Sequence, residues 1–208
     1  LDLPGSGDFV TPEQFQPVAQ PLDEHGQPAV WEACQTFSGS WGYHRDEATW
    51  KSVPQLLWML IDGVSKNGNL LLNVGPTGRG EFDQRAQERL AGIGEWMKRH
   101  SRSIYGCGAA PPELPCPQDC RLTYNAAANR LYVHVLNWPM KHLWLQGDAY
   151  VRRVQYAQLL NDASEIQIKG IEPWQEENSG VKRGAALGLT LPIIKPPVEI
   201  PVIELFLK

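Results

Sequence analysis

The run of residues from Ser52 to Tyr105 constrains the fold more than any other part of the sequence. Between Val53 and Val64, apolar residues recur at three- and four-residue intervals, which predicts a helix with one apolar face. Ser52 and Gln55 have the spacing of a capping box at its start, and Asn67-Gly68 is a left-handed stop signal after its end. The sequence itself therefore sets both ends of this helix.

A strand, a loop and a second helix are predicted immediately afterwards. Asn69 to Val74 is a nearly continuous apolar run, typical of a strand that is buried on both faces. Residues 75–80 lack the Gly-Lys-Ser/Thr ending of a phosphate-binding loop, so we interpret them as a glycine-rich turn. A helix from about Asp83 to Arg102 follows. This order of elements indicates a parallel α/β layer, and a (β/α)8 barrel in particular.

The first fifty residues are predicted to be rich in loops, beginning with the Gly/Pro-containing stretch 1–8. Thr11-Pro12-Glu13 indicates a turn into a short helix, because proline suits the first helical position. Residues 31–43 end in Ser40-Trp41-Gly42-Tyr43, and their aromatic and small-residue composition describes a functional loop better than a regular element.

A different pattern begins after Tyr105. Residues 106–120 are rich in Gly, Pro and Cys and are interpreted as a linker. Short β-type runs separated by turn-forming residues follow, and their spacing indicates an antiparallel sandwich. The runs cover residues 121–124, 131–136, 142–145, 151–159, 165–168, 185–191 and 202–207.

The predicted fold class is therefore α/β plus all-β. We expect residues 1–106 to form the last part of a (β/α)8 catalytic barrel and residues 107–208 to form a C-terminal antiparallel β-sandwich. A complete barrel needs roughly 200–250 residues, whereas about 105 residues precede the sandwich. Either the α/β part is a smaller layered fold, or the chain is the C-terminal portion of something longer.

Charge and motif content exclude several classes of function. The sequence contains 19 Lys and Arg against 23 Asp and Glu, a net charge of −4. This balance does not predict a basic surface that would bind nucleic acid or an anionic membrane. No apolar stretch approaches the ~18 residues that cross a bilayer. The five histidines lack the spacing of a metal site, and no serine sits in a Gly-x-Ser-x-Gly motif. We therefore predict no metal and no nucleic-acid or membrane partner.

The four cysteines leave two interpretations open. Their spacing provides neither a C-x2-C pair nor the nearby histidines of a zinc site. Reduced structural thiols are one interpretation, and a loop disulfide in an oxidising compartment is the other. The residues are Cys34, Cys107, Cys116 and Cys120.

Three carboxylates near the start of the chain are candidates for acid/base chemistry. Glycoside hydrolysis needs two carboxyl groups, one of them able to hold a proton near neutral pH. Asp8 and Glu13 lie in a segment that could project into a cleft, and Glu32 has the apolar indole of Trp31 as its neighbour, which would raise its pKa by desolvation. For all three, a solvated surface acid is the alternative.

Two aromatic residues and one amide are further candidates. Trp41 and Tyr43 offer apolar faces with polar tips that suit stacking on a sugar, and the alternative is an aromatic plug that packs a loop onto a barrel rim. Asn73 lies near the carboxyl end of the predicted strand, the side on which barrels carry their chemistry. It could orient a loop or a catalytic group, or make a structural hydrogen bond.

Several segments, taken together, resemble the α-L-fucosidases of glycoside hydrolase family 29. They match in order and spacing over residues 1 to about 106, and the string Asn-Leu-Leu-Leu-Asn-Val-Gly-Pro at 69–76 is the most specific of them. Beyond 106 the likeness is architectural, since that family carries a β-sandwich after its barrel. The matching segments are Gly7–Glu13, Trp31–Thr36, Ser40–Tyr43, Ser65–Pro76, Glu88–Leu90, Gly94–Trp96 and Ser103–Gly106.

This resemblance implies a retaining exo-glycosidase that releases α-L-fucose from fucosylated glycans through a covalent intermediate. It implies that Glu13 is the acid/base, with Glu32 as its rival, that Trp41 lines the pocket around the fucose C6 methyl group, and that Asp8 and Tyr43 lie close by. The nucleophilic aspartate would lie upstream of Leu1, so the missing N-terminal barrel segment is an expected partner and the fragment alone is expected to be inactive. No cofactor is implied, because two carboxyl groups suffice for the reaction.

A second hypothesis is a non-catalytic module, a β-sandwich that binds carbohydrate or a partner without chemistry. Three tryptophans of the predicted sandwich motivate it, because an exposed indole can serve as a sugar platform. Burial of the same tryptophans at a domain interface is the alternative. The residues are Trp138, Trp144 and Trp174.

Overall fold

The computed structural model describes residues 7–208, so the expectations for residues 1–6 lie outside the described part. The chain divides into two compact units, one up to Lys98 and the other from Arg99 onward. The predicted domain boundary at residue 106 stays a prediction. Among the described residues, no helix has the length and apolar character needed to span a bilayer.

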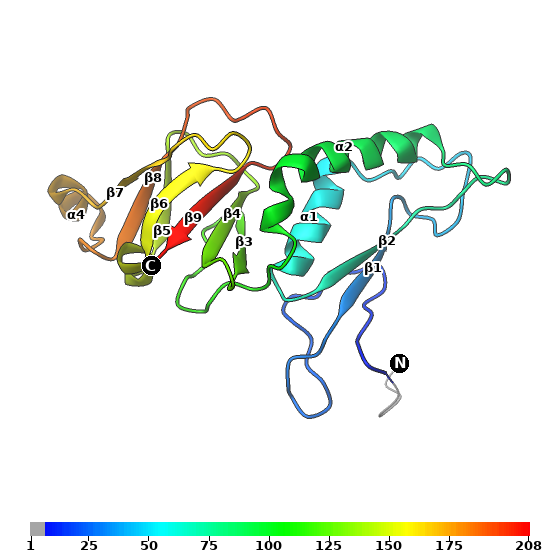
Figure 1. The fold of residues 1–208 in the computed structure, drawn as a ribbon, viewed down its shortest axis with the longest axis horizontal. Coiled ribbons are helices and arrows are strands. Elements are labelled where there is room, and N and C mark those ends of the chain that lie inside the picture. Colours follow the sequence, from blue (N-terminus) through cyan, green and yellow to red (C-terminus); the bar gives the residue numbers. More distant parts are fainter. Residues whose placement is uncertain (1–6) are drawn as a thin grey trace. The chain divides into compact units, whose positions relative to one another are not determined.

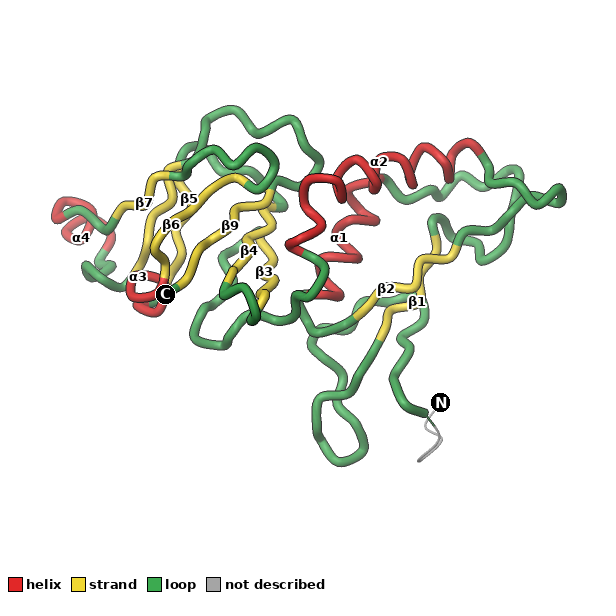
Figure 2. The backbone as a smooth tube through the Cα atoms, viewed as in Figure 1, coloured by secondary structure: helices red, strands yellow, loops and turns green. Residues whose placement is uncertain are grey.

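The first unit is a mixed α/β structure. It contains strand β1 (Glu32–Thr36), helix α1 (Val53–Val64), strand β2 (Asn69–Asn73) and most of helix α2 (Gln84–His100), joined by long loops (Figures 1 and 2). The two strands pair in parallel, from Glu32 opposite Asn69 to Thr36 opposite Asn73. The strand–helix–strand unit is the parallel α/β arrangement that the sequence predicts.

Helix α1 begins and ends where its sequence signals lie. The Ser52 backbone N–H donates to Gln55 Oε1 over 2.8 Å, and the Gln55 N–H donates to Ser52 Oγ over 3.4 Å, which completes the capping box. Beyond the helix, Asn67 has φ of 58°, in the left-handed region. Gly68 is required by packing, because a Cβ there would lie 2.2 Å from the Trp31 ring.

Two predictions for the first fifty residues are wrong. The backbone around Pro12 and Glu13 is extended instead of helical, and it bridges to β1 in parallel, at Val10 opposite Trp31 and at Glu13 opposite Cys34. Residues 32–36, expected within a loop, form β1 itself. In both cases the partner backbone comes from distant sequence, so local composition could not indicate the pairing.

The prediction that the strand after α1 is buried on both faces is also wrong for the structure of this chain. Leu70 and Leu72 pack with the apolar cluster that Leu56 and Met59 of α1 form with Phe37. The opposite face of β2 is open, and its Leu71 is 49% exposed. A nearly continuous apolar run is typical of a two-sided strand, and this unit supplies cover on one side only.

The second unit contains two antiparallel sheets and two short helices. The larger sheet has the strand order β3-β4-β9-β6, and the smaller has the order β5-β8-β7. The strands are β3 (Cys120–Asn125), β4 (Arg130–Val135), β5 (His142–Gln146), β6 (Val154–Leu159), β7 (Gln167–Lys169), β8 (Ala186–Thr190) and β9 (Val202–Leu207). The helices are α3 (Asp148–Arg153) and α4 (Pro173–Ser179), and the 3-10 turn η1 (Ser101–Ser103) follows α2.

The expected β-type runs are therefore present as strands, with one correction. Residues 148–153, at the start of the run predicted for 151–159, form helix α3, and strand β6 begins only at Val154. Inward-facing apolar residues from both sheets join one buried core, in which Leu131, Leu145 and Leu205 are completely inaccessible to solvent. This shared core, rather than any long helix, holds the second unit together.

Candidate active site

The strands of the first unit present one open face. Alternate side chains of a strand point to opposite sides, and α1 covers the side that carries Leu70 and Leu72. The other side is open, and it bears polar side chains at regular positions. This open face carries Glu32 and Cys34 from β1 and Asn69, Leu71 and Asn73 from β2, while Thr36, on the same side at the carboxyl end of β1, is completely buried.

Both candidate acid/base residues belong to the open face. Glu13 bridges in parallel to Cys34, so its side chain shares the side on which Cys34 and Glu32 lie. The backbone around it is fixed by hydrogen bonds from Cys34 N to Pro12 O and from Gln14 N to Cys34 O, each 2.9 Å. Glu13 is exposed, whereas Glu32 is half-buried at the amino end of β1. Because Glu13 lies opposite Cys34, two residues beyond Glu32 along β1, it is nearer than Glu32 to the carboxyl end of the layer, where parallel α/β folds carry their chemistry.

The aromatic candidates lie on the loop that follows β1. Trp41 and Tyr43 are each 40% exposed, so part of each ring is accessible to a ligand. Asn73 Nδ2 donates to the Trp41 carbonyl over 2.6 Å, which ties the end of β2 to this loop. A Cβ at Gly75 would lie 2.5 Å from the Gly42 and Tyr43 backbone, so only glycine allows this approach. Asn73 thus orients a loop, one of the roles considered for it above.

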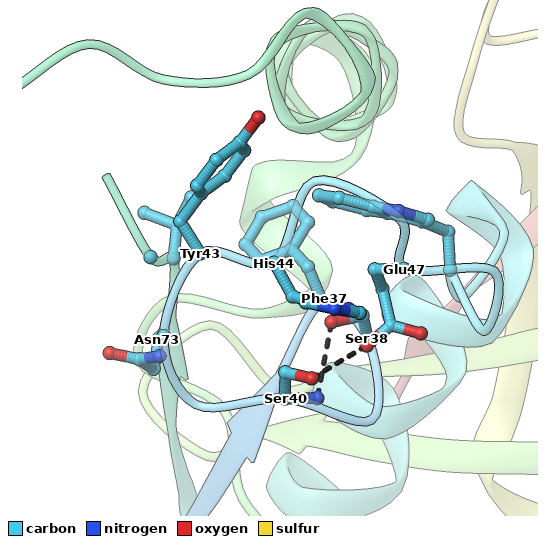
Figure 3. Close-up of a pocket in the computed structure, with 11 residues that line it drawn as sticks. Phe37, Ser38, Ser40, Tyr43, His44, Glu47 and Asn73 are labelled. Atoms are coloured by element: carbon cyan, nitrogen blue, oxygen red, sulfur yellow. Dashed lines mark hydrogen bonds between the residues drawn. The ribbon is translucent and has the colours of Figure 1, made fainter. Parts of the chain in front are cut away.

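A small hollow opens beside this loop (Figure 3). Tyr43 and Asn73 lie at one side of it, while Ser40 and Glu47 form hydrogen-bonded groups at the other. Trp41 is not among the lining residues, which are Phe37, Ser38, Ser40, Gly42, Tyr43, His44, Glu47, Trp50, Asn73, Val74 and Gly75.

A lysine that sequence reasoning missed holds the base of the loop. The Lys51 ammonium group donates to three oxygens at the carboxyl end of β1: the Thr36 carbonyl at 2.7 Å, the Thr36 hydroxyl at 3.4 Å and the Ser38 carbonyl at 3.1 Å. Desolvation by burial lowers the pKa of this lysine, and the negative charge of Glu47 partly opposes that shift. Lys51 therefore fixes the direction in which the chain leaves β1.

Glu47 organises the middle of the same loop. Its carboxylate accepts hydrogen bonds from the Thr49 N–H at 2.7 Å, the Thr49 hydroxyl at 2.6 Å and the Ser40 hydroxyl at 2.7 Å. These donors, above all the Thr49 hydroxyl, lower the pKa of Glu47 to about 2. Glu47 is consequently charged at neutral pH and serves as an anchor, not as a proton donor.

Two arginines of α2 fasten the end of the loop. Arg85 donates to the Glu47 carbonyl at 2.9 Å and to the Arg45 carbonyl at 3.1 Å, and Arg89 donates to the Lys51 carbonyl at 2.6 Å. Both guanidinium groups also lie over the Trp50 ring, 4.8 and 5.1 Å from its centroid. The loop bearing Trp41 and Tyr43 is thus held in place before any ligand arrives.

Two of the three cysteines of the second unit are held as neutral thiols. In the structure all four are free thiols. Burial raises the pKa of Cys107 to about 11 and that of Cys120 to about 12, so both remain protonated at neutral pH. Among the described residues, no group of three or more His, Cys, Asp or Glu side chains is arranged to hold a metal ion.

Comparison with known proteins connects this geometry to one family. Residues 2–102 match the family model described as Alpha-L-fucosidase. Plasma alpha-L-fucosidase of Homo sapiens is 38% identical over 84 residues, covering 39% of this chain and 18% of the relative. The alpha-L-fucosidase of Dictyostelium discoideum is 28% identical over 183 residues, covering 86% of this chain and 38% of the relative.

Solved structures agree with the sequence comparison over nearly the whole chain. Alpha-L-fucosidase isoenzyme 1 from Paenibacillus thiaminolyticus has a TM-score of 0.85 at 38% identity and covers 97% of this chain and 45% of its own. The Thermotoga maritima alpha-fucosidase in complex with a mechanism-based inhibitor has a TM-score of 0.71 at 27% identity, with 94% and 42% covered. The chain thus spans less than half the length of the relatives it matches.

Proposed function

We propose that this chain, which belongs to the α-L-fucosidase family through residues 2–102, is the C-terminal part of a retaining glycosidase that releases α-L-fucose from fucosylated glycans. One observation carries the proposal. The residues that match the family are those that build the parallel layer, and the same layer brings Glu13 to the open face, opposite Cys34 in the middle of β1. A glycosidase acid/base needs such a position, accessible to a glycosidic oxygen.

In the proposed mechanism, Glu13 acts twice. A carboxyl nucleophile attacks the anomeric carbon while the protonated Glu13 gives its proton to the leaving oxygen; the Glu13 carboxylate then takes a proton from the water that hydrolyses the fucosyl-enzyme ester. Retention requires the two carboxyl groups to lie about 5–5.5 Å apart. We propose that the nucleophile is an aspartate contributed by polypeptide beyond this sequence, with Glu32 as the rival for the acid/base role.

The proposed architecture follows from the same reasoning. The parallel layer is proposed to be the last part of a (β/α)8 barrel within residues 1–106, and the two antiparallel sheets a β-sandwich within residues 107–208. Two paired strands and one bridged segment cannot close a barrel of eight. An N-terminal barrel segment is therefore the proposed partner that covers the open face, and the chain without it is proposed to be inactive.

Trp41 and Tyr43 are the proposed substrate contacts. Their accessible rings can stack on the C–H side of a sugar, and an apolar wall from Trp41 near the C6 methyl group would favour a 6-deoxy sugar. That preference is modest, because one hydroxyl group against an apolar wall costs about 1–3 kcal/mol. Lys51, Glu47 and the two arginines are proposed to hold these rings in position.

Release of fucose from a chromogenic α-L-fucoside tests the proposal. The chain joined to an N-terminal barrel half of an α-L-fucosidase should turn over the substrate, whereas the chain alone should not. Glu13→Ala should lower kcat by about 100-fold or more, the usual contribution of a general acid/base. Glu24→Ala is the matched control, because Glu24 is exposed and pairs with the neighbouring His25. Normal turnover in Glu13→Ala with collapse in Glu32→Ala would transfer the role to Glu32, and loss in neither would refute both assignments.

A further inference from the structure

The outer face of the smaller sheet in the second unit carries a flat aromatic surface. Side chains that point away from the core alternate with buried leucines along β5 and β8. On the outer side, Trp144 of β5 lies opposite Gly188 of β8, which in turn lies opposite Lys169 of β7. The indole, half-buried, therefore occupies the middle of this three-strand face.

Gly188 explains why the indole can lie against the sheet. A Cβ at this position would be 2.8 Å from Trp144 Cζ3 and 3.0 Å from Cη2, so the six-membered ring rests directly over the glycine. A larger residue would push the ring away from the sheet. One side of the indole is thus covered by backbone, which leaves the other side as a fixed apolar plane.

Polar side chains surround this plane. His142 lies 6.3 Å from Trp144 between ring centroids, with the two rings tilted by 38°. Gln146, Gln167 and Lys169 are exposed, and within residues 7–208 none of these three side chains is hydrogen-bonded or ion-paired to another group. They offer amide donors, amide acceptors and ammonium donors at the edge of an apolar plane.

The chemistry of this face selects a carbohydrate over other ligands. A pyranose ring presents C–H groups on one side, which pack on an indole, and hydroxyl groups at its edge, which accept and donate hydrogen bonds. The residues that form the face include no carboxylate and only one lysine, so they favour neither a cationic nor a strongly anionic partner. Neighbouring strands are about 4.8 Å apart, so the backbones at Trp144 and Lys169, two strands apart, are separated by about 9.6 Å. That spacing leaves room for one sugar ring on the indole with the Lys169 side chain at its edge.

We propose that Trp144, Gln146, Gln167 and Lys169 form a binding site for a neutral sugar ring of a glycan chain. The site is separate from the proposed active site and does not depend on the proposed fucosidase activity. The other two tryptophans of the second unit are less suited. Trp138 packs against the core and donates its Nε1–H to the Pro192 carbonyl at 3.0 Å, and Trp174 is 62% exposed on the seven-residue helix α4.

The test titrates the full chain with lactose and with 2′-fucosyllactose while NMR follows the indole N–H of Trp144 and the side-chain amides of Gln146 and Gln167. We expect both sugars to shift these signals with dissociation constants of about 1–10 mM, as suits a single stacked ring. Following the local signals separates this site from any fucose binding in the first unit.

Three variants decide the role of the face. Trp144→Leu keeps an apolar cover over Gly188 but removes the plane, and should weaken binding by about three- to tenfold. Lys169→Ala removes a side chain that makes no hydrogen bond or ion pair within residues 7–208, and it should weaken binding while the melting temperature stays unchanged. Trp174→Leu, the control, should leave both unchanged.

A tryptophan that only shields the glycine would behave differently. In that case Trp144→Leu would lower stability, and none of the three signals would shift at about 50 mM of either sugar. Absence of these shifts in the wild-type chain, or equal affinity in the wild type and Lys169→Ala, would overturn the proposal. Should Trp144→Leu fail to fold, Lys169→Ala with Gln167→Ala gives the same decision.

Discussion

The two units of the chain are built on opposite principles. In the first, a parallel layer packs on one side only, and Leu71 on its other side is 49% exposed. In the second, two sheets enclose one core in which Leu205 is completely buried. The second unit stabilises itself, whereas the first leaves an apolar and polar face for something else to cover. The open face is also where the candidate acid/base lies.

The largest expected effect is a difference in unfolding free energy between two Leu→Ala substitutions, one in each unit. Leu205→Ala should lower the free energy of unfolding of the second unit by about 3–4 kcal/mol, because it removes buried methyl groups and leaves a cavity. Leu71→Ala should cost less than about 1 kcal/mol in this chain, as is usual for exposed positions. Urea denaturation of both variants measures the contrast. Equal losses would contradict the one-sided layer, and a rise in the cost of Leu71→Ala after addition of the N-terminal barrel segment would sharpen it.

A buried carboxylate in the second unit gives the next effect. Glu204 on β9 accepts hydrogen bonds from Arg102 at 2.8 Å, Gln158 at 2.7 Å and the Tyr132 hydroxyl at 3.3 Å. Glu204→Ala leaves these donors without their acceptor and should cost about 2–3 kcal/mol. Glu177→Ala, an exposed glutamate of α4, is the control and should cost nothing measurable. A stable Glu204→Ala variant would show that the network adds no stability.

A buried histidine makes the stability of the second unit depend on pH. His134 is completely buried, and desolvation, with the nearby His100 charge as a smaller cause, lowers its pKa from 6.5 to about 3. Because the folded pKa is below the unfolded one, the unfolded state binds the extra proton first as pH falls, and stability is lost from pH 6.5 downward. Between about pH 6.5 and 4.5 the loss should reach about 2 kcal/mol.

Unfolding of His134→Gln over the same pH range checks this slope. A glutamine amide can still donate to the Thr123 hydroxyl, which His134 Nε2 approaches at 2.9 Å, but it does not titrate. The variant should therefore have the flatter profile, while the exposed His142→Gln should keep the wild-type slope. Identical profiles for all three proteins would assign the slope to other groups.

The smallest effect concerns the loop of the candidate active site. The pKa of Glu47 is depressed from 4.5 to about 2 by the Thr49 and Ser40 hydrogen bonds, so its contribution to loop order is complete above pH 4.5 and is lost as pH falls through about 2. Glu47→Gln should speed hydrogen exchange of the Thr49 amide at neutral pH without moving the unfolding midpoint. Asp46→Asn, which affects only the pair with Arg45, should change neither.

The two units also differ in how far sequence alone predicted them. Helix α1 and the strands of the second unit were predictable because their signals are local: the Ser52–Gln55 cap, the apolar period, and alternation between turn-forming residues. Strand β1 was not, because its partners are residues 10–13 and 69–73. Helix α3 was not predictable for another reason: its last residues, 151–153, directly precede the β-type run of β6.

At the candidate site, residue types were easier to predict than their supports. Glu13, Glu32, Trp41 and Tyr43 could be proposed from chemistry and from family likeness. Lys51 could not, because its bonds go to backbone oxygens 13 and 15 residues away, and no spacing rule marks such a contact. Arg85 reaches the Glu47 carbonyl across 38 residues for the same reason.

One measurement tests the central claim that Glu13 is the acid/base of a retaining fucosidase. Glu13→Ala, in the chain joined to its N-terminal barrel segment, is given an activated α-L-fucoside and azide. Azide should restore turnover and yield α-fucosyl azide, because it attacks the covalent intermediate that water can no longer reach efficiently, and the second inversion restores the starting configuration. Turnover unaffected by the substitution, or rescue that yields β-fucosyl azide, would contradict the assignment.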